Sequence, residues 1–197
     1  LDLLLSERDS DFAIDPDFLK AKEIAYRLLD KAYKIMQEET EQDFLEKEFK
    51  NISFAQLDLT PNLLSVLEKR LEEVNKCLKG NIPLSCIFSI GSILEGILLS
   101  TANKCPQKFN QSSCCPKDKN GKVPTFPDWT LAQLIDVSHD VGLLTLDVKK
   151  FSHSVRDFRN YIHPNQQMIS NFDPDIHTAK ICFQVLKAAI ADLSGER

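Results

Sequence analysis

The stretch "IPLSCIFSIGSILEGILLSTA", residues 82–102, decides the fold. It is apolar on nearly every side, and Pro83 suits the first turn of a helix. A helix that is hydrophobic all round is buried, so we expect this one at the centre of a helical bundle. It is long enough to span a membrane, but Glu95, four serines and two glycines interrupt it. This favours a core helix in a protein without membrane contact.

Helical periodicity continues on both sides of this stretch. Glycine is scarce, at six residues, and the alternation typical of strands is nearly absent. Apolar residues recur at helical spacing, with Pro, Thr or Asp at the starts and Gly or Pro at the ends. The sequence therefore predicts an all-α bundle of five or six helices. The expected helices cover residues 15–36, 60–80, 83–101, 128–142, 145–163 and 173–193.

Residues 102–127 have no periodicity and many turn formers, which predicts one long irregular loop. Three cysteines crowd it and raise the question of a zinc site. The pairs lack the C-x-x-C spacing of structural zinc sites, so a loop of free thiols, without metal or cofactor, is favoured. The ligands weighed for zinc are Cys105, Cys114, Cys115 and either His139 or His153.

Charge divides the chain. Residues 1–60 hold 15 acidic and 8 basic residues, although the whole chain has a net charge of only −5. We therefore expect residues 1–59 to form an acidic N-terminal extension, with one amphipathic helix packing on a bundle of residues 60–197. The opening "LDLLL" is too short for a signal peptide, so we expect a cytoplasmic protein.

The stretch "SVRDFRNYIHP", residues 154–164, carries the chemistry. On a helix, Arg156, Arg159, Asn160 and His163 fall at i, i+3, i+4 and i+7, which places them on one face. Guanidinium groups bind phosphate by forked hydrogen bonds, and histidine moves protons near neutral pH. These are the parts for metal-free RNA cleavage. The plainer interpretation is that they complement the helix dipole and cap carbonyl groups.

Glu95 bears on this choice, because a carboxylate in an apolar helix is costly to bury unless it is paired. We expect it to pair with Arg156 or Arg159 across the bundle. The pair would either orient a catalytic arginine or neutralise a structural one.

The segment "VRDFRNYIHP", preceded by "TLAQLIDVSHDVGLL" and "GSILEGILL", resembles the HEPN superfamily of small helical bundles. Many members are metal-independent endoribonucleases of toxin–antitoxin and defence systems, with an arginine, a polar residue and then a histidine. Arg156–Asp157 followed by His163 fits this pattern. The resemblance implies Arg156 and His163 as the catalytic pair, with support from Arg159, Asn160, Asp157 and Glu95.

In that family the active site usually forms between two protomers, so the resemblance also implies a homodimer with this helix near the two-fold axis. Two functions stay open. One is a metal-independent ribonuclease or RNA-binding protein of the bacterial defence type. The other is a non-catalytic dimer that binds a nucleotide or a protein, such as an antitoxin or regulator, and uses the same residues as a structural network with Glu95. Exposure of Arg156 and His163 would distinguish them.

Overall fold

A computed structural model describes residues 22, 24–28 and 53–196 of the chain. The chain divides into two compact units, Leu1–Lys47 and Glu48–Arg197. The described residues of the first unit are helical. Most of the predicted amphipathic helix over residues 15–36 lies outside the described residues, and its packing on the bundle stays a prediction.

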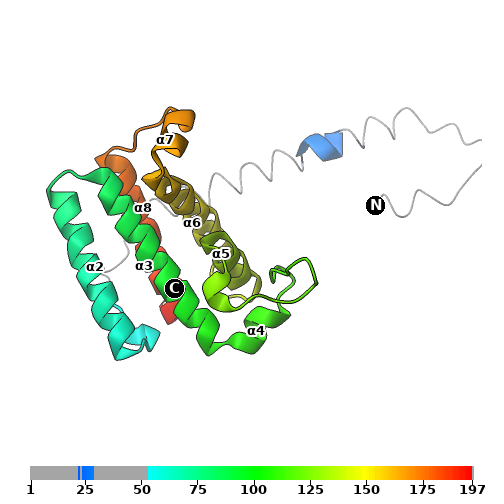
Figure 1. The fold of residues 1–197 in the computed structure, drawn as a ribbon. Helices are drawn as coiled ribbons and strands as arrows, with labels where there is room; N and C mark the ends of the chain where they lie inside the picture. The colour runs from blue at the N-terminus through cyan, green and yellow to red at the C-terminus, as the bar shows by residue number, and fades with distance from the viewer. Residues whose placement is uncertain (1–21, 23, 29–52, 197) are drawn as a thin grey trace, which may run out of the picture. The chain divides into compact units, whose positions relative to one another are not determined.

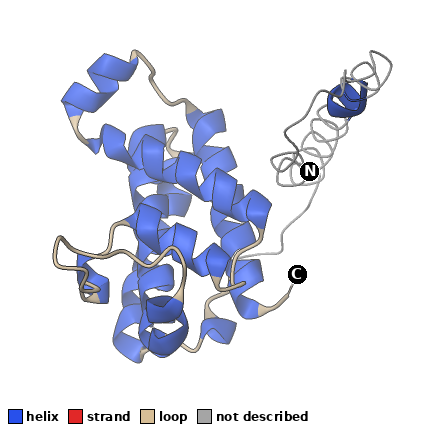
Figure 2. Cartoon of the chain, turned by 90° about the vertical axis from the view of Figure 1, so that its right-hand side faces the viewer, coloured by secondary structure: helices blue, strands red, loops and turns tan. Residues whose placement is uncertain are grey.

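The described part of the second unit consists of helices, turns and loops, without strands, which confirms the all-α prediction (Figures 1 and 2). Five helices of ten or more residues build it, joined by shorter α and 3-10 helices. The long helices are α2 (Pro61–Lys79), α3 (Pro83–Lys104), α5 (Leu131–Asp140), α6 (Leu146–Arg159) and α8 (Ile176–Ser194). The short elements are η2 (Ala55–Leu57), α4 (Pro106–Gln111), η3 (Phe126–Asp128), η4 (Asn160–Ile162) and α7 (Pro164–Ser170).

Helix α3 lies at the centre of the bundle, as predicted. It contacts α2, α5, α6 and α8, and Figure 1 shows it running between its neighbours. Ile90, Leu94 and Ile97 are among its fully buried residues. By length and composition α3 could also cross a membrane, a property that core helices of soluble proteins share. The absence of membrane contact therefore stays a prediction.

Residues 53–59, which precede α2, are part of the helical bundle. Phe54 and Leu57 are buried, and η2 contacts α8. The Lys104 ammonium donates to the Leu57 carbonyl and lies 3.5 Å from the Asp58 carboxylate. Residues 53–59 thus pack on the same core as α3 and α8.

The predicted irregular loop over residues 102–127 is only partly irregular. Helix α3 runs on to Lys104, and the loop contains α4 and η3. Phe109 of α4 is fully buried, and the Phe126 and Trp129 ring centroids lie 5.0 Å apart in an edge-to-face contact. These three rings give the segment a small apolar core of its own, which a periodicity search cannot detect.

The predicted end of the helix over residues 145–163 is wrong. Helix α6 stops at Arg159, η4 follows, and His163 is extended with φ −91° and ψ 108°. Pro164 then takes the first position of α7. The physical reason is that proline disfavours helical geometry at the residue before it, yet suits the first turn of a new helix.

Candidate functional site

Arg159 joins the last turn of α6 to the centre of α3. Its Nη2 donates to Glu95 Oε2 at 2.7 Å, and the two side chains are only 32% and 31% exposed. The predicted pairing of Glu95 with one of the two arginines is therefore confirmed, and the partner is Arg159. The carboxylate in the apolar helix has its counterion on the neighbouring helix.

A glycine makes this pair possible. A Cβ atom added to Gly91 would lie 2.7 Å from Cδ of Arg159 and 3.1 Å from its Cγ. The aliphatic stem of Arg159 therefore lies directly on the backbone of α3, one turn before Glu95. Gly91 was not among the site residues predicted from the sequence. The only signal was a glycine four positions before the sole acid of α3.

Arg156 has a partner outside this pair. Its Nε donates to Asp157 Oδ1 at 3.0 Å, and its Nη2 donates to the same oxygen. Positions 156 and 159 lie about 60° apart around an α-helix, so the two arginines start from neighbouring positions but bind different carboxylates. Each guanidinium group of the predicted phosphate site is therefore paired with a carboxylate of its own.

Asn160 and His163 lie beyond the end of α6. Asn160 is the C-cap of α6 and its side chain is exposed. Its carbonyl accepts a hydrogen bond from the His163 backbone N–H at 3.1 Å. His163 is also exposed and directly precedes α7. The predicted single face of four polar residues is therefore wrong, because the helix that was to carry it ends too early.

The region on both sides of His163 presents apolar side chains to solvent. We call Ile162, Met168, Ile169 and Phe172 the α7 surface. They are 57%, 72%, 69% and 41% exposed. The Phe172 ring stacks on Phe158 of α6, with centroids 5.5 Å apart. This surface was not predicted from the sequence, because the expected helix ended at Pro164.

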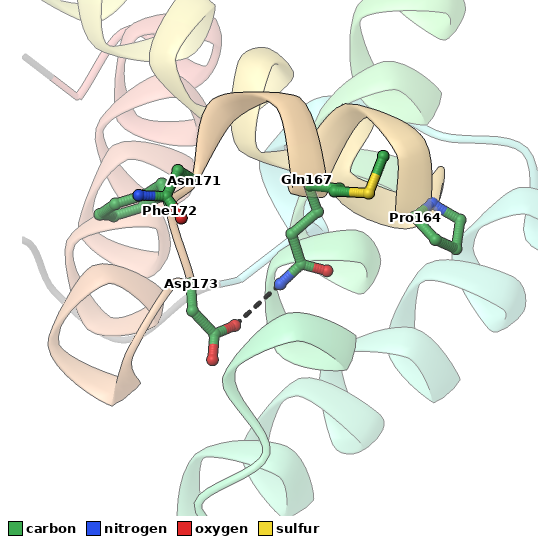
Figure 3. Close-up of a pocket in the computed structure, with 6 residues that line it drawn as sticks. Pro164, Gln167, Asn171, Phe172 and Asp173 are labelled. Carbon is green, nitrogen blue, oxygen red and sulfur yellow. Dashed lines mark hydrogen bonds between the residues drawn. The ribbon is translucent and has the colours of Figure 1, made fainter.

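A groove of about 380 Å³ lies beside the α7 surface (Figure 3). Gln167 Nε2 donates to Asp173 Oδ1 at 2.8 Å across it, which ties α7 to the segment that leads into α8. Residues lining the groove are Pro164, Gln167, Met168, Asn171, Phe172 and Asp173.

A second polar cluster links α5 to the first half of α6. The Asp136 Oδ1 atom lies 2.9 Å from Lys149 Nζ and 3.1 Å from His153 Nε2. Burial tends to raise the pKa of Asp136, but hydrogen bonds and charge from Lys149 and His153 outweigh it and lower that pKa. The cluster fastens two helices together.

The loop cysteines gather no metal site within the described residues, where no three His, Cys, Asp or Glu side chains lie in position to share an ion. Both histidines weighed as a fourth ligand have other partners. His139 Nδ1 lies 2.8 Å from the Leu144 carbonyl, and His153 is bound to Asp136.

The site therefore contains two separately paired arginines, an exposed histidine and an apolar surface. No family model matches the chain, and comparisons with curated proteins and solved structures found no significant match. The geometry of these residues is accordingly the basis for the function proposed below.

Proposed function

We propose that this protein is a binding module that pairs with a second copy of itself through the α7 surface. The observation that carries the proposal is the gathering of four large apolar side chains, at 41–72% exposure, on η4, α7 and the residues just after it. Met168 and Phe172 line one groove, and η4 contacts α7, so these side chains belong to neighbouring elements. Single exposed apolar residues are ordinary, whereas a group of them on one part of the surface marks an interaction site.

A second copy fits this surface because its polar neighbours carry both signs of charge. Asp173 directly follows Phe172, and His163 directly follows Ile162. The ion pair of Arg156 and Asp157 directly precedes Phe158, whose ring stacks on Phe172. A two-fold contact places one patch against itself, so it needs complementary charges within one patch. The resemblance to HEPN proteins, which are usually dimeric, supports the same partner.

Two interactions hold the elements that carry this surface in place. The bond from Arg159 to Glu95 fixes the end of α6, and the Phe158–Phe172 contact holds the segment after α7 against α6. On this proposal, Arg159 and Glu95 have a positioning role and do not contact a substrate.

Sedimentation velocity over a range of protein concentrations tests the dimer. We expect the wild type to dimerise and Met168→Glu to remain monomeric, because a charge in an apolar contact must be desolvated. Ile181→Glu is the matched control, since Ile181 is 49% exposed on α8. A wild type that stays monomeric, or equal effects of the two variants, would overturn the proposal.

A metal-independent endoribonuclease is the second function that we propose to test. It is favoured by the exposed imidazole of His163 beside Ile162 of the α7 surface. Pairing through this surface would bring two copies of His163 close to each other. His163 would then act as general acid or base, while Arg156 would stabilise charge on the phosphate.

RNA cleavage in excess EDTA tests this second function. The proteins to compare are the wild type, His163→Ala, Arg156→Ala and the matched control His177→Ala, which removes another exposed histidine. A nuclease requires cleavage by the wild type and by the control, and loss of cleavage in both site variants. Inactivity of the wild type would reject the nuclease and leave the dimer untouched.

A further inference from the structure

A second groove of about 380 Å³ lies between α2 and α3, which pack side by side (Figure 1). This groove is distinct from the groove beside α7, since the two share no lining residue. Most of its walls are apolar. The main apolar residues are Val66, Leu67, Leu99, Pro127, Trp129 and Leu134.

Gly96 leaves one wall of this groove without a side chain. Gly96 lines it from α3, and a Cβ there would meet Leu67 Cδ2 at 3.3 Å. Val66, on the opposing helix α2, is 47% exposed to solvent. The groove volume falls within the range of small-molecule sites, which starts at about 300 Å³.

Two charged side chains line the groove, and they are not equivalent. The Glu95 carboxylate already accepts a hydrogen bond from Arg159. Arg70 donates from Nη1 to the Ser92 hydroxyl, and among the described residues no carboxylate lies within 4.0 Å of its guanidinium nitrogens. Among the residues that line the groove, Arg70 is thus a cation without a carboxylate partner, while the Glu95 carboxylate is already paired with Arg159.

Arg70 can donate more hydrogen bonds than the one to Ser92. A guanidinium group has five N–H donors in a planar fork, and the bond from Nη1 to Ser92 uses only one of them. A partly buried cation without a counterion beside apolar walls is best stabilised by an anion with two acceptor oxygens.

We propose that the groove between α2 and α3 binds a small apolar carboxylate. The carboxylate group would accept hydrogen bonds from Arg70, and the alkyl or aryl part would lie along Val66, Leu99 and Trp129. The site does not depend on dimerisation or on RNA cleavage, because it uses neither the α7 surface nor His163.

Trp129 supplies the readout, since it is the only tryptophan of the chain and lines the groove. Sodium decanoate, 1-decanol and decylammonium chloride would be titrated below their aggregation limits into the full chain while tryptophan emission is followed. We expect saturable binding of decanoate, with decanol weaker by about tenfold and decylammonium weaker still.

Two variants separate the charge of Arg70 from general effects. Arg70→Gln should weaken decanoate binding by about tenfold and leave decanol unchanged. Lys69→Gln is the matched control, because it removes the same charge from the adjacent, exposed position of α2. Val66→Asp, at an exposed position, gives an independent test and should weaken decanoate more than decanol.

Equal affinities for decanoate and decanol would overturn the proposal and indicate a groove that takes a neutral ligand or an apolar side chain of a protein. Absence of any saturable change in Trp129 emission would overturn it as well. If Arg70→Gln loses its circular dichroism signal, Val66→Asp decides. Unchanged decanoate binding in a folded Val66→Asp protein would then reject the carboxylate site.

Discussion

The stretch at residues 154–164 has two halves that behave differently. The first half ends α6, and its Arg159 lies over Gly91 and binds Glu95. The second half leaves the helix and exposes Ile162 and His163. Polar residues that are close together in sequence therefore have two different roles. Some stabilise the packing of α6 on α3, and others are exposed at the surface. The first half should control stability and the second half association.

The largest effect should come from the glycine under Arg159. Gly91→Ala places a Cβ 2.7 Å from Arg159 Cδ, in the middle of the side chain, whereas Gly96→Ala meets only a terminal methyl of Leu67 at 3.3 Å. Both changes gain about 1 kcal/mol of helix propensity, while overpacking costs about 1–3 kcal/mol. We expect the free energy of unfolding of Gly91→Ala to lie about 2 kcal/mol below that of Gly96→Ala.

Urea unfolding followed by circular dichroism measures this difference. The two variants lie on the same helix and gain the same methyl group, so each serves as the control for the other. Equal stability of the two would show that Arg159 moves aside at no cost, and the first half of the stretch would lose its framework role.

The two ion pairs of α6 should differ in strength, because their side chains differ in exposure. A double-mutant cycle with Glu95→Gln and Arg159→Met should give a coupling energy of about 1–2 kcal/mol, because both groups are mostly shielded from solvent. The Arg156–Asp157 pair should couple by less than about 0.5 kcal/mol, since the Asp157 side chain is 57% exposed.

The same unfolding assay reads both cycles, and the second is the control for the first. A coupling energy near zero for Glu95 and Arg159 would mean that solvent screens this pair as fully as the surface pair. Strong coupling between Arg156 and Asp157 would instead show that this exposed pair also stabilises the framework.

The sequence was sufficient to predict the helical class, the long helices and the central place of α3. Apolar periodicity carries this information, and residues such as Thr60 and Pro83 mark the helix starts. The segment at residues 102–127 was harder. Its order depends on contacts among Phe109, Phe126 and Trp129, which lie too irregularly in sequence to form a pattern.

The candidate site was predictable only in part. The pairing of Glu95 followed from the cost of burying a carboxylate, which is a physical rule that needs no coordinates. The common face for Arg156 and His163 depended on a helix that continues to residue 163. Pro164 was treated only as a stop, whereas it also begins α7 and so sets His163 apart from α6.

The smallest effect should appear as a pH dependence at the other end of α6. The lowered pKa of Asp136 means that its bonds to Lys149 and His153 stabilise the fold above the unfolded pKa, about 4. That contribution is lost as pH falls through the lower folded pKa. The Asp136 side chain is 38% exposed, so the loss should stay below about 1 kcal/mol.

Urea unfolding between pH 7 and pH 2 measures this loss, and the free energy of unfolding of Asp136→Asn should fall less steeply toward acid pH than that of the wild type. His153→Gln should fall between the two, because it removes one of the two cations and leaves Lys149. Identical slopes for all three proteins would place the acid sensitivity of the bundle elsewhere.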